Sequence, residues 1–271
     1  MSRIPLAGRR IWLTGASSGI GRACALEFAR RGARLALSAR NTAALEAIGS
    51  EIGTDSVLIV PLDVRFRKAN HEAVERIVKA WGGIDTVVLN AGVAEYVDED
   101  DFDAEVFDRV FATNLHGFVY GMEACLPVLK RGTSPHLVGI SSASTFLPLP
   151  RGEAYGAAKS ALRYLLDSYR YRAEAKGLWV TCVHPGFVKT QMTDHNDFPM
   201  PFLVSAKDAA EAIADGIEAR KREIHFPKPL TWTMKISALM PLWLYQNLIP
   251  RLVKVPRKFV PRAGATGVRA N

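Results

Sequence analysis

The stretch TGASSGIG, residues 14–21, decides the fold. It lies between a β-rich apolar run, Arg9–Thr14, and a helical pattern, Ile20–Arg31. Glycines at a strand-to-helix junction let the backbone turn tightly and bring the free N–H groups of the helix start against a phosphate. The spacing is GxxxGxG, whereas the general dinucleotide fingerprint is GxGxxG. We therefore predict a dinucleotide site here, the simpler alternative being a plain glycine-rich turn.

The same alternation of strand and helix continues along most of the chain. Predicted strands cover Arg9–Thr14, Arg34–Ala39, Ser56–Pro61, Ile84–Asn90, His136–Ser141, Trp179–Val183 and Glu223–Phe226. Predicted helices cover Ile20–Arg31, a segment from Thr42, Asn70–Trp81, a long region broken near Pro127, a segment from Glu153, and Ala206–Arg220. Such alternation implies a parallel sheet with helices on both faces, joined by right-handed crossovers. We predict one α/β domain over residues 1–226, a doubly wound Rossmann fold with a parallel seven-stranded sheet.

Residues 227–271 are predicted to be a C-terminal extension, because the alternation stops at Pro227 and prolines recur. Its part Leu230–Ile249 contains Trp232, Leu239, Met240, Leu242, Trp243, Leu244, Tyr245 and Leu248. Basic residues follow them at Arg251, Lys254, Arg257, Lys258 and Arg262. This pattern suits a segment lying on an anionic membrane, while Lys235 and Pro241 argue against a spanning helix. A lid over the substrate pocket and a subunit contact remain equal alternatives.

The net charge of +8 is confined to the end of the chain. Glu223 is the last acidic residue, and eight basic residues follow it, so the preceding chain carries equal numbers of each sign. A nucleic-acid-binding body would carry its own basic face, so no nucleic-acid partner is expected. Three scattered cysteines and six dispersed histidines indicate neither disulfides nor a metal site. We expect a cytoplasmic protein, with peripheral contact at the inner membrane surface as an option.

The cofactor is indicated at the end of the second predicted strand, which reads LSAR over residues 37–40. An NAD enzyme places an acidic residue there to bind the ribose 2′-hydroxyl. Here the acidic residue is missing, and the guanidinium of Arg40 can pair with a 2′-phosphate. NADP(H) is therefore preferred, the alternative being that Arg40 is an ordinary surface arginine.

Six further motifs follow the glycine loop in order. They are Asp63-Val64, Asn90-Ala91-Gly92, Asn114 in NLHG, Ser142 in ISSAS, Tyr155 and Lys159 in YGAAK, and HPGFVKT at 184–190. Together the seven motifs resemble the short-chain dehydrogenase/reductase family over about Arg9–Phe226. The resemblance implies an NADP(H)-dependent oxidoreductase that interconverts a carbonyl and an alcohol, and that forms a homodimer or homotetramer. Leu89 and Ser144 depart from the usual family residues without removing a group that the chemistry needs.

The resemblance also assigns roles to individual residues. The catalytic set would be Asn114, Ser142, Tyr155 and Lys159. The cofactor-binding set would be Gly15, Ser17, Ser18, Gly19, Ile20, Gly21, Arg40, Asp63, Val64, Asn90, Ala91, Gly92, Tyr155, Lys159, Pro185, Gly186, Val188 and Thr190. Within it, Asp63 and Val64 would contact the adenine, Asn90 would support the sheet and ribose, and Val188 and Thr190 would bond the carboxamide. Asn114 would anchor a water that relays protons from Lys159.

The chemistry suits these side chains. Tyr155 and Lys159 are four residues apart on a predicted helix and therefore share a face. A nearby ammonium favours the phenolate, so we expect Lys159 to lower the pKa of Tyr155 from its ordinary value of about 10. Tyr155 would then exchange a proton with the substrate oxygen, which Ser142 would hold. His184, beside this motif, has no acidic or cysteine companions and is expected to be structural.

Apolar residues cluster after Ser142 and around Thr190. They are Phe146, Leu147, Phe187, Met192, Phe198, Met200, Phe202 and Leu203. They suit a pocket for a lipid-like, steroid-like or aromatic ketone or alcohol, the alternative being ordinary packing. Two other functions compete with the enzyme: a catalytically silent cofactor-binding scaffold, and a membrane-surface module that uses the basic C-terminal segment.

Overall fold

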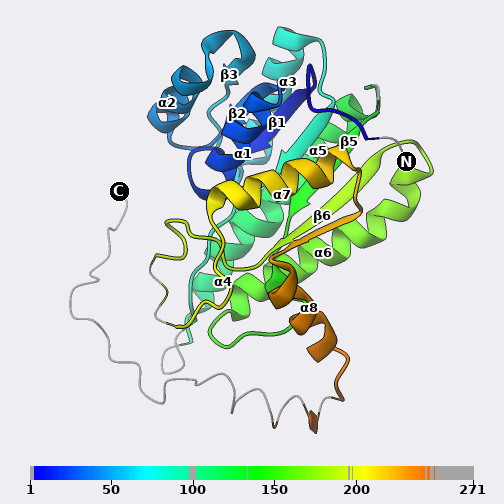
Figure 1. Cartoon of the computed structure of the whole chain (residues 1–271). Helices are drawn as coiled ribbons and strands as arrows, with labels where there is room; N and C mark the ends of the chain where they lie inside the picture. The colour runs from blue at the N-terminus through cyan, green and yellow to red at the C-terminus, as the bar shows by residue number, and fades with distance from the viewer. Residues whose placement is uncertain are drawn as a thin grey trace.

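A seven-stranded parallel sheet forms the centre of the molecule (Figure 1). The computed structural model describes residues 3–97, 102–132, 134–194, 196, 198–241, 243, 244 and 247. The strands are β1 (Arg10–Thr14), β2 (Arg34–Ser38), β3 (Val57–Ile59), β4 (Thr86–Leu89), β5 (His136–Ile140), β6 (Trp179–Pro185) and β7 (Glu223–Phe226). Their order across the sheet is β3-β2-β1-β4-β5-β6-β7, and all neighbours run parallel. The predicted doubly wound Rossmann fold is confirmed.

Helices cover both faces of the sheet. One face carries α1 (Gly19–Arg30), α2 (Thr42–Ile52) and α7 (Ala206–Glu218), and the other carries α3 (Arg67–Trp81), α5 (Gly117–Leu129) and α6 (Glu153–Glu174). Side chains of β1 alternate between the two cores, since Ile11 and Leu13 face the first layer and Trp12 faces the second. The apolar side chains of β1 are fully buried on both faces, which fixes the register of this strand and hence the position of the loop that follows it.

The sequence suggests that the long helical region is broken near Pro127, but the helix continues through this residue. Pro127 lies inside α5, close enough to its end that the missing N–H removes a single bond of the last turn. The interruption lies earlier, where the π-helical turn η2 (Ala112–His116) joins α4 (Ala104–Phe111) to α5. Wider turns of this kind often occur at functional sites, and this one carries Asn114.

Several predicted boundaries also shift. The strand predicted from Ser56 begins one residue later, because the turn η1 (Thr54–Ser56) precedes it, and it ends at Ile59. The helix predicted from Asn70 begins at Arg67, and β6 continues to Pro185. These differences of a few residues are ordinary at element ends and leave the layer arrangement unchanged.

The start of the C-terminal extension forms a helix, α8 (Lys228–Ser237), which packs beside β7 (Figure 1). Several predicted membrane-contacting residues lie outside the described residues: Leu242, Tyr245, Leu248, Arg251, Lys254, Arg257, Lys258 and Arg262. In the part of the chain that the structure describes, no helix has the length and hydrophobicity needed to span a bilayer.

Candidate active site

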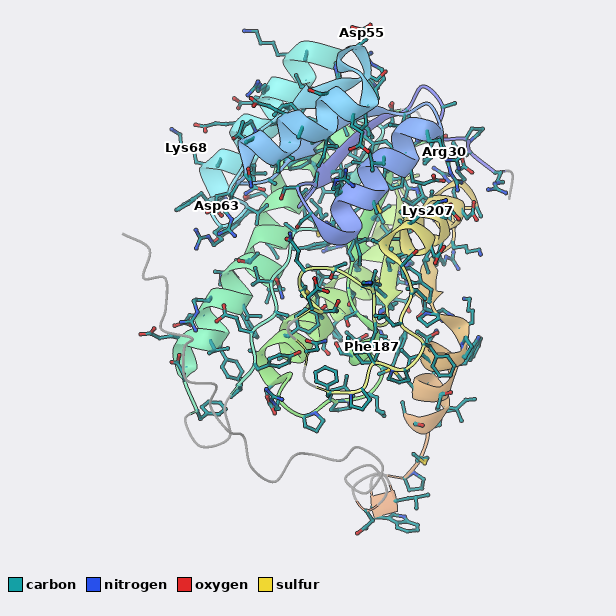
Figure 2. All side chains as sticks on the ribbon, turned by 60° about the vertical axis from the view of Figure 1, so that its left-hand side comes forward. Arg30, Asp55, Asp63, Lys68, Phe187 and Lys207 are labelled. Atoms are coloured by element: carbon teal, nitrogen blue, oxygen red, sulfur yellow. The ribbon has the colours of Figure 1, made fainter. Side chains whose placement is uncertain are left out.

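A large cavity of about 1450 Å³ opens at the carboxyl edge of the sheet. Ligand pockets usually measure about 300–1,000 Å³, so this one has room for a dinucleotide and a second molecule. Every residue of the predicted cofactor and catalytic sets lines it except Asn114. Asp63 and Phe187, which both line the cavity, lie well apart in Figure 2, so the cavity is elongated.

The glycine loop after β1 is built for close approach. Gly15 has a φ of 66°, and a Cβ there would lie 2.7 Å from Ala91 Cα. A Cβ at Gly21 would lie 2.0 Å from the carbonyl oxygen of Gly15. Asn90 holds the loop from β4, since its Nδ2 donates to the carbonyl oxygens of Thr14 and Gly15 at 3.1 Å each. Neither glycine can be replaced without moving this backbone.

The beginning of α1 faces the cavity and has free donors. Ser18 is its N-cap residue, and the Ser18 side chain makes no capping hydrogen bond. The first N–H groups of a helix have no partner within the helix and carry the positive end of its dipole. A pyrophosphate therefore fits this loop, because glycines keep the cradle narrow and the start of the helix supplies donors.

The end of β2 places an exposed arginine at the cavity. Arg40 follows Ala39, and both residues line the cavity. No hydrogen bond or ion pair engages Arg40 within the described residues. Asp63, in contrast, is held by Arg65 at 2.6 Å, and this pairing lowers the pKa of the Asp63 carboxyl. Asp63 is thus paired with Arg65, and the charge of Arg40 also helps to lower the pKa of Asp63, while Arg40 itself makes no hydrogen bond or ion pair within the described residues.

Ser142, Tyr155 and Lys159 come together at one wall of the cavity. Ser142 caps the short turn η3 (Ala143–Thr145), and Tyr155 and Lys159 lie on the first turns of α6. The Ser142 hydroxyl lies beside the half-buried Tyr155 side chain. It also accepts hydrogen bonds from the backbone N–H of Ser144 at 3.1 Å and the Ser144 hydroxyl at 3.0 Å. Ser144 therefore leaves the Ser142 proton free to point toward Tyr155 or a substrate.

Burial dominates the electrostatics of the pair. The pKa of Tyr155 is raised above its ordinary value, because loss of solvent outweighs the opposing effect of the nearby Ser142 hydroxyl. The buried Lys159 ammonium has its pKa lowered to about 8 by the same cause, and its Nζ donates to the carbonyl oxygen of Ile140 at 2.8 Å. It lies 5.8 Å from the Tyr155 ring centroid. The sequence predicts a lowered tyrosine pKa, whereas this geometry keeps Tyr155 a neutral phenol at neutral pH.

Asn114 lies behind the wall instead of in it. Its side chain is fully buried, its Oδ1 accepts from the N–H of Val93 at 2.8 Å, and its Nδ2 donates to the carbonyl oxygen of Val93 at 2.8 Å. The π-helical turn thus clamps the loop after β4, and Val93 itself lines the cavity.

The substrate end of the cavity is apolar and partly aromatic. Of the predicted residues, Leu147, Phe187, Met192 and Phe198 line it, whereas Phe146, Met200, Phe202 and Leu203 do not. Phe146 is buried behind the wall, 4.7 Å from the His184 ring. Sequence reasoning missed Tyr96, which packs edge-on against Phe198. It also missed Leu230 and Met234, whose i, i+4 spacing on α8 was the available signal.

His184 supports the Ser142 turn, and it has an acidic companion that the sequence did not reveal, since its Nε2 lies 3.7 Å from Glu223 Oε1. Its Nδ1 lies 3.2 Å from both the Ser142 carbonyl oxygen and the Thr145 hydroxyl. The ring is 2% exposed, and burial lowers the pKa of His184 to about 4. A neutral imidazole with the proton on Nδ1 satisfies both contacts.

Known proteins of this architecture match over most of the chain. A family model described as short chain dehydrogenase matches residues 9–198. An uncharacterized oxidoreductase of Myxococcus xanthus is 36% identical over 246 residues, which cover 90% of this chain and 97% of that protein. An uncharacterized oxidoreductase of Staphylococcus epidermidis is 31% identical over 201 residues, covering 74% of this chain and 87% of that protein.

Two solved structures share the fold. A 3-ketoacyl-(acyl-carrier-protein) reductase of Brucella melitensis, complexed with NADH, is 25% identical, with a TM-score of 0.75 and coverage of 81% of this chain and 97% of that one. An alcohol dehydrogenase of Thermococcus sibiricus, complexed with 5-hydroxy-NADP, is 27% identical, with a TM-score of 0.73 and coverage of 80% and 95%.

Proposed function

This chain belongs to the short-chain dehydrogenase family, and we propose that it is an NADP(H)-dependent oxidoreductase that interconverts an apolar ketone and its secondary alcohol. One observation carries the proposal. Ser142, Tyr155 and Lys159 lie in the wall of the same cavity that the donor-rich glycine loop and the unpaired Arg40 line. A nucleotide and a reacting oxygen can therefore occupy one continuous space.

Separate groups would hold each part of the cofactor. The glycine loop and the start of α1 suit the pyrophosphate, and Asp63 with Val64 suits the adenine. Val188 and Thr190, which also line the cavity, would bind the carboxamide. The related structures contain NADH in one case and an NADP derivative in the other, so the preference for NADP(H) rests on Arg40. Bound NADP(H) would supply or accept the hydride.

The residues of this chain handle the proton and the substrate oxygen. In reduction, Tyr155 holds its proton on the phenol oxygen and gives it to the forming alkoxide. Ser142 donates to the same oxygen, since its own acceptor positions are filled by Ser144. Lys159, protonated below about pH 8, keeps a positive charge behind Tyr155 that stabilises the developing negative charge. The relay water at Asn114 stays a prediction, and the clamp on Val93 supplies a positioning role.

The substrate class follows from the lining of the cavity. Phe187, Phe198 and Met192 on the loop after β6 face the cavity together with Leu147 and Leu230. These side chains offer little to a charged or sugar-like substrate and suit a lipid-like, steroid-like or aromatic carbonyl compound.

A screen of NADPH oxidation tests the proposal. Purified protein is incubated with ketones of increasing apolar size, and loss of NADPH absorbance is followed with and without each ketone. We expect turnover that improves with apolar size and a weaker rate with NADH. A protein that binds NADPH but turns over no ketone or secondary alcohol in either direction would instead be a silent scaffold, and the proposal would fail.

A further inference from the structure

Helix α8 has two faces with different environments. Its inner face is buried: Thr231 is fully covered, and Met234 is 8% exposed in a small core with Phe146 and Leu147. Leu230 and Met234 also line the active-site cavity. The helix is held by Lys235, whose Nζ lies 2.8 Å from Glu223 Oε2. The inner face therefore forms part of the substrate end of the cavity.

The outer face of the same segment is apolar and uncovered. Trp232, Ile236, Leu239 and Trp243 are 54%, 63%, 84% and 66% exposed. We call these four residues the outer stripe. Trp232 and Ile236 are four residues apart and share one side of α8, whereas Leu239 and Trp243 follow beyond the end of the helix. The chain keeps turning after α8, with a bond from the N–H of Leu239 to the carbonyl oxygen of Ile236. Single exposed apolar residues are ordinary, but four large exposed ones in one short segment mark a contact surface.

Further exposed apolar side chains lie on a second element at the same edge of the sheet. Met192, Phe202 and Leu203 are 44%, 56% and 43% exposed, and they belong to the loop that follows β6. Both this loop and α8 begin at the carboxyl ends of neighbouring parallel strands, and both line the cavity. Figure 1 shows the two segments at the same end of the molecule. The rim of the cavity is thus apolar on two sides.

Charge identifies the kind of surface that covers the outer stripe. Eight basic residues and no acidic residue follow Glu223 in the sequence, whereas the rest of the chain has equal numbers of both signs. A second copy would cover the apolar residues but would bring the same positive charge and no acidic partner for it. Nucleic acid would satisfy the charge but leave the tryptophans and leucine in water. An anionic lipid surface accommodates both the positive charge and the exposed apolar residues. Tryptophan and aliphatic side chains enter the membrane interface, while lysine and arginine bind the headgroups.

We propose that the outer stripe docks this protein on an anionic membrane, with the mouth of the cavity facing the lipid. An apolar substrate can then pass from the bilayer along α8 into the cavity without crossing water. The entry route rests on the proposed function, whereas the docking itself does not require the protein to be an enzyme.

Co-sedimentation with lipid vesicles tests the docking. The full chain is mixed with vesicles of phosphatidylcholine alone, or with phosphatidylglycerol added, at low and high salt. We expect binding to the anionic vesicles at low salt, falling roughly tenfold or more at high salt or without phosphatidylglycerol. Fluorescence of Trp232 and Trp243 shifts to shorter wavelength on binding.

A triple variant, Ile236→Ser with Leu239→Ser and Trp243→Ser, removes most of the outer stripe without touching the cavity. We expect it to keep the fold, NADPH binding and turnover of a small soluble ketone, and to lose vesicle binding by roughly tenfold or more. The matched control is Tyr164→Ser with Tyr171→Ser, which removes equally exposed aromatic residues from α6 and keeps vesicle binding.

Several outcomes overturn the docking proposal. The proposal fails if the full chain does not bind anionic vesicles, or if the triple variant binds them equally well. It also fails if the chain is retained on duplex DNA in place of vesicles, or if the triple variant changes only the oligomeric state in light scattering. None of these results depends on turnover. An inactive protein that still binds vesicles would reject the proposed function alone, and an active protein that ignores vesicles would reject the docking alone.

Discussion

The imidazole Nδ1 of His184 lies 3.2 Å from the carbonyl oxygen of Ser142, which connects strand β6 to the turn that carries a proposed catalytic hydroxyl. Thr145 strengthens the connection, since its hydroxyl donates to the same carbonyl oxygen at 2.8 Å and lies 3.2 Å from His184. The ring also packs against Phe146 at 4.7 Å. One buried side chain thus sets the position of the Ser142 turn.

His184→Ala therefore tests positioning. We expect kcat for ketone reduction to fall by roughly tenfold, because the Ser142 turn loses its donor and its packing partner. The affinity for NADPH stays within about twofold, since His184 does not line the cavity. The free energy of unfolding falls by about 2–4 kcal/mol. An unchanged kcat in a destabilised variant would limit His184 to stability.

Tyr155→Phe tests the proton donor. We expect turnover to fall by about 10²–10⁴-fold, because the phenol oxygen is lost, while NADPH still binds with the ring in place. Tyr171→Phe, on the exposed side of the same helix, is the matched control and keeps full activity. Turnover within tenfold of the natural protein would remove Tyr155 from the chemistry.

Arg40→Ala tests the cofactor preference. In fluorescence titrations we expect the natural protein to bind NADPH more tightly than NADH, and the variant to lose roughly tenfold to a hundredfold of that difference. Ala39→Asp shifts the preference toward NADH, because its carboxylate repels the 2′-phosphate. Arg76→Ala, which removes an exposed arginine of α3 outside the cavity, has no effect. Equal affinities in the natural protein would contradict the role given to Arg40.

The rate of reduction is expected to fall at alkaline pH. The pKa of Lys159 is lowered to about 8, so its ammonium is present below that pH and is lost above it, while Tyr155 keeps its raised pKa and its proton. We expect kcat/KM for NADPH, which reports the free enzyme, to decline above about pH 8. A profile that stays flat to the pKa range of an ordinary lysine would show that Lys159 is not titrating in the site.

Acid is expected to destabilise the fold through three buried histidines, which are His184, His225 and His136, and burial holds the pKa of His136 well below its ordinary value. The pKa values of His184 and His225 are each lowered to about 4, mainly by burial. Glu223, Arg163 and Asp167 face the first ring, and Lys228, Lys235, Glu223 and Lys221 the second. A depressed histidine pKa means that the unfolded chain binds the proton more readily.

The contribution of these histidines to the free energy of unfolding should accordingly be fully present above about pH 6.5. It should be lost progressively toward pH 4, by a few kcal/mol in all. Urea unfolding at several pH values measures this. The window from pH 6.5 to 5 isolates the effect of the histidines, because carboxylates in ion pairs take up protons only at lower pH. His225→Gln should flatten the slope in that window. A free energy of unfolding that is constant across it would contradict the prediction.

The parts of the site that could be predicted from the sequence are those held by local geometry. The glycine loop joins one strand to one helix, and Tyr155 and Lys159 share a helix face at four residues' spacing. The sheet could be predicted for the same reason, since each strand and each helix has its own hydrophobic period.

The remaining parts depend on how distant segments meet. The approach of Leu230 and Met234 to the cavity depends on the path of the chain after β7, and the contact of His184 with Ser142 joins residues from neighbouring strands. The raised pKa of Tyr155 reflects burial, which spacing along a helix does not reveal. The π-helical turn at Asn114 follows from a clamp on Val93 across 21 residues.

The packing of α1 against α7 has a consequence for how the protein is made. Phe28 on α1 is buried in the same core as Ile213 on α7, and Arg31 binds Asp215 at 2.8 Å. During synthesis, β1, β2 and α2 can cover part of the apolar side of α1, but the part that contacts α7 stays open until the last helix of the sheet domain has left the ribosome. A chain truncated before residue 206 therefore keeps the glycine loop but leaves part of its first core open to water.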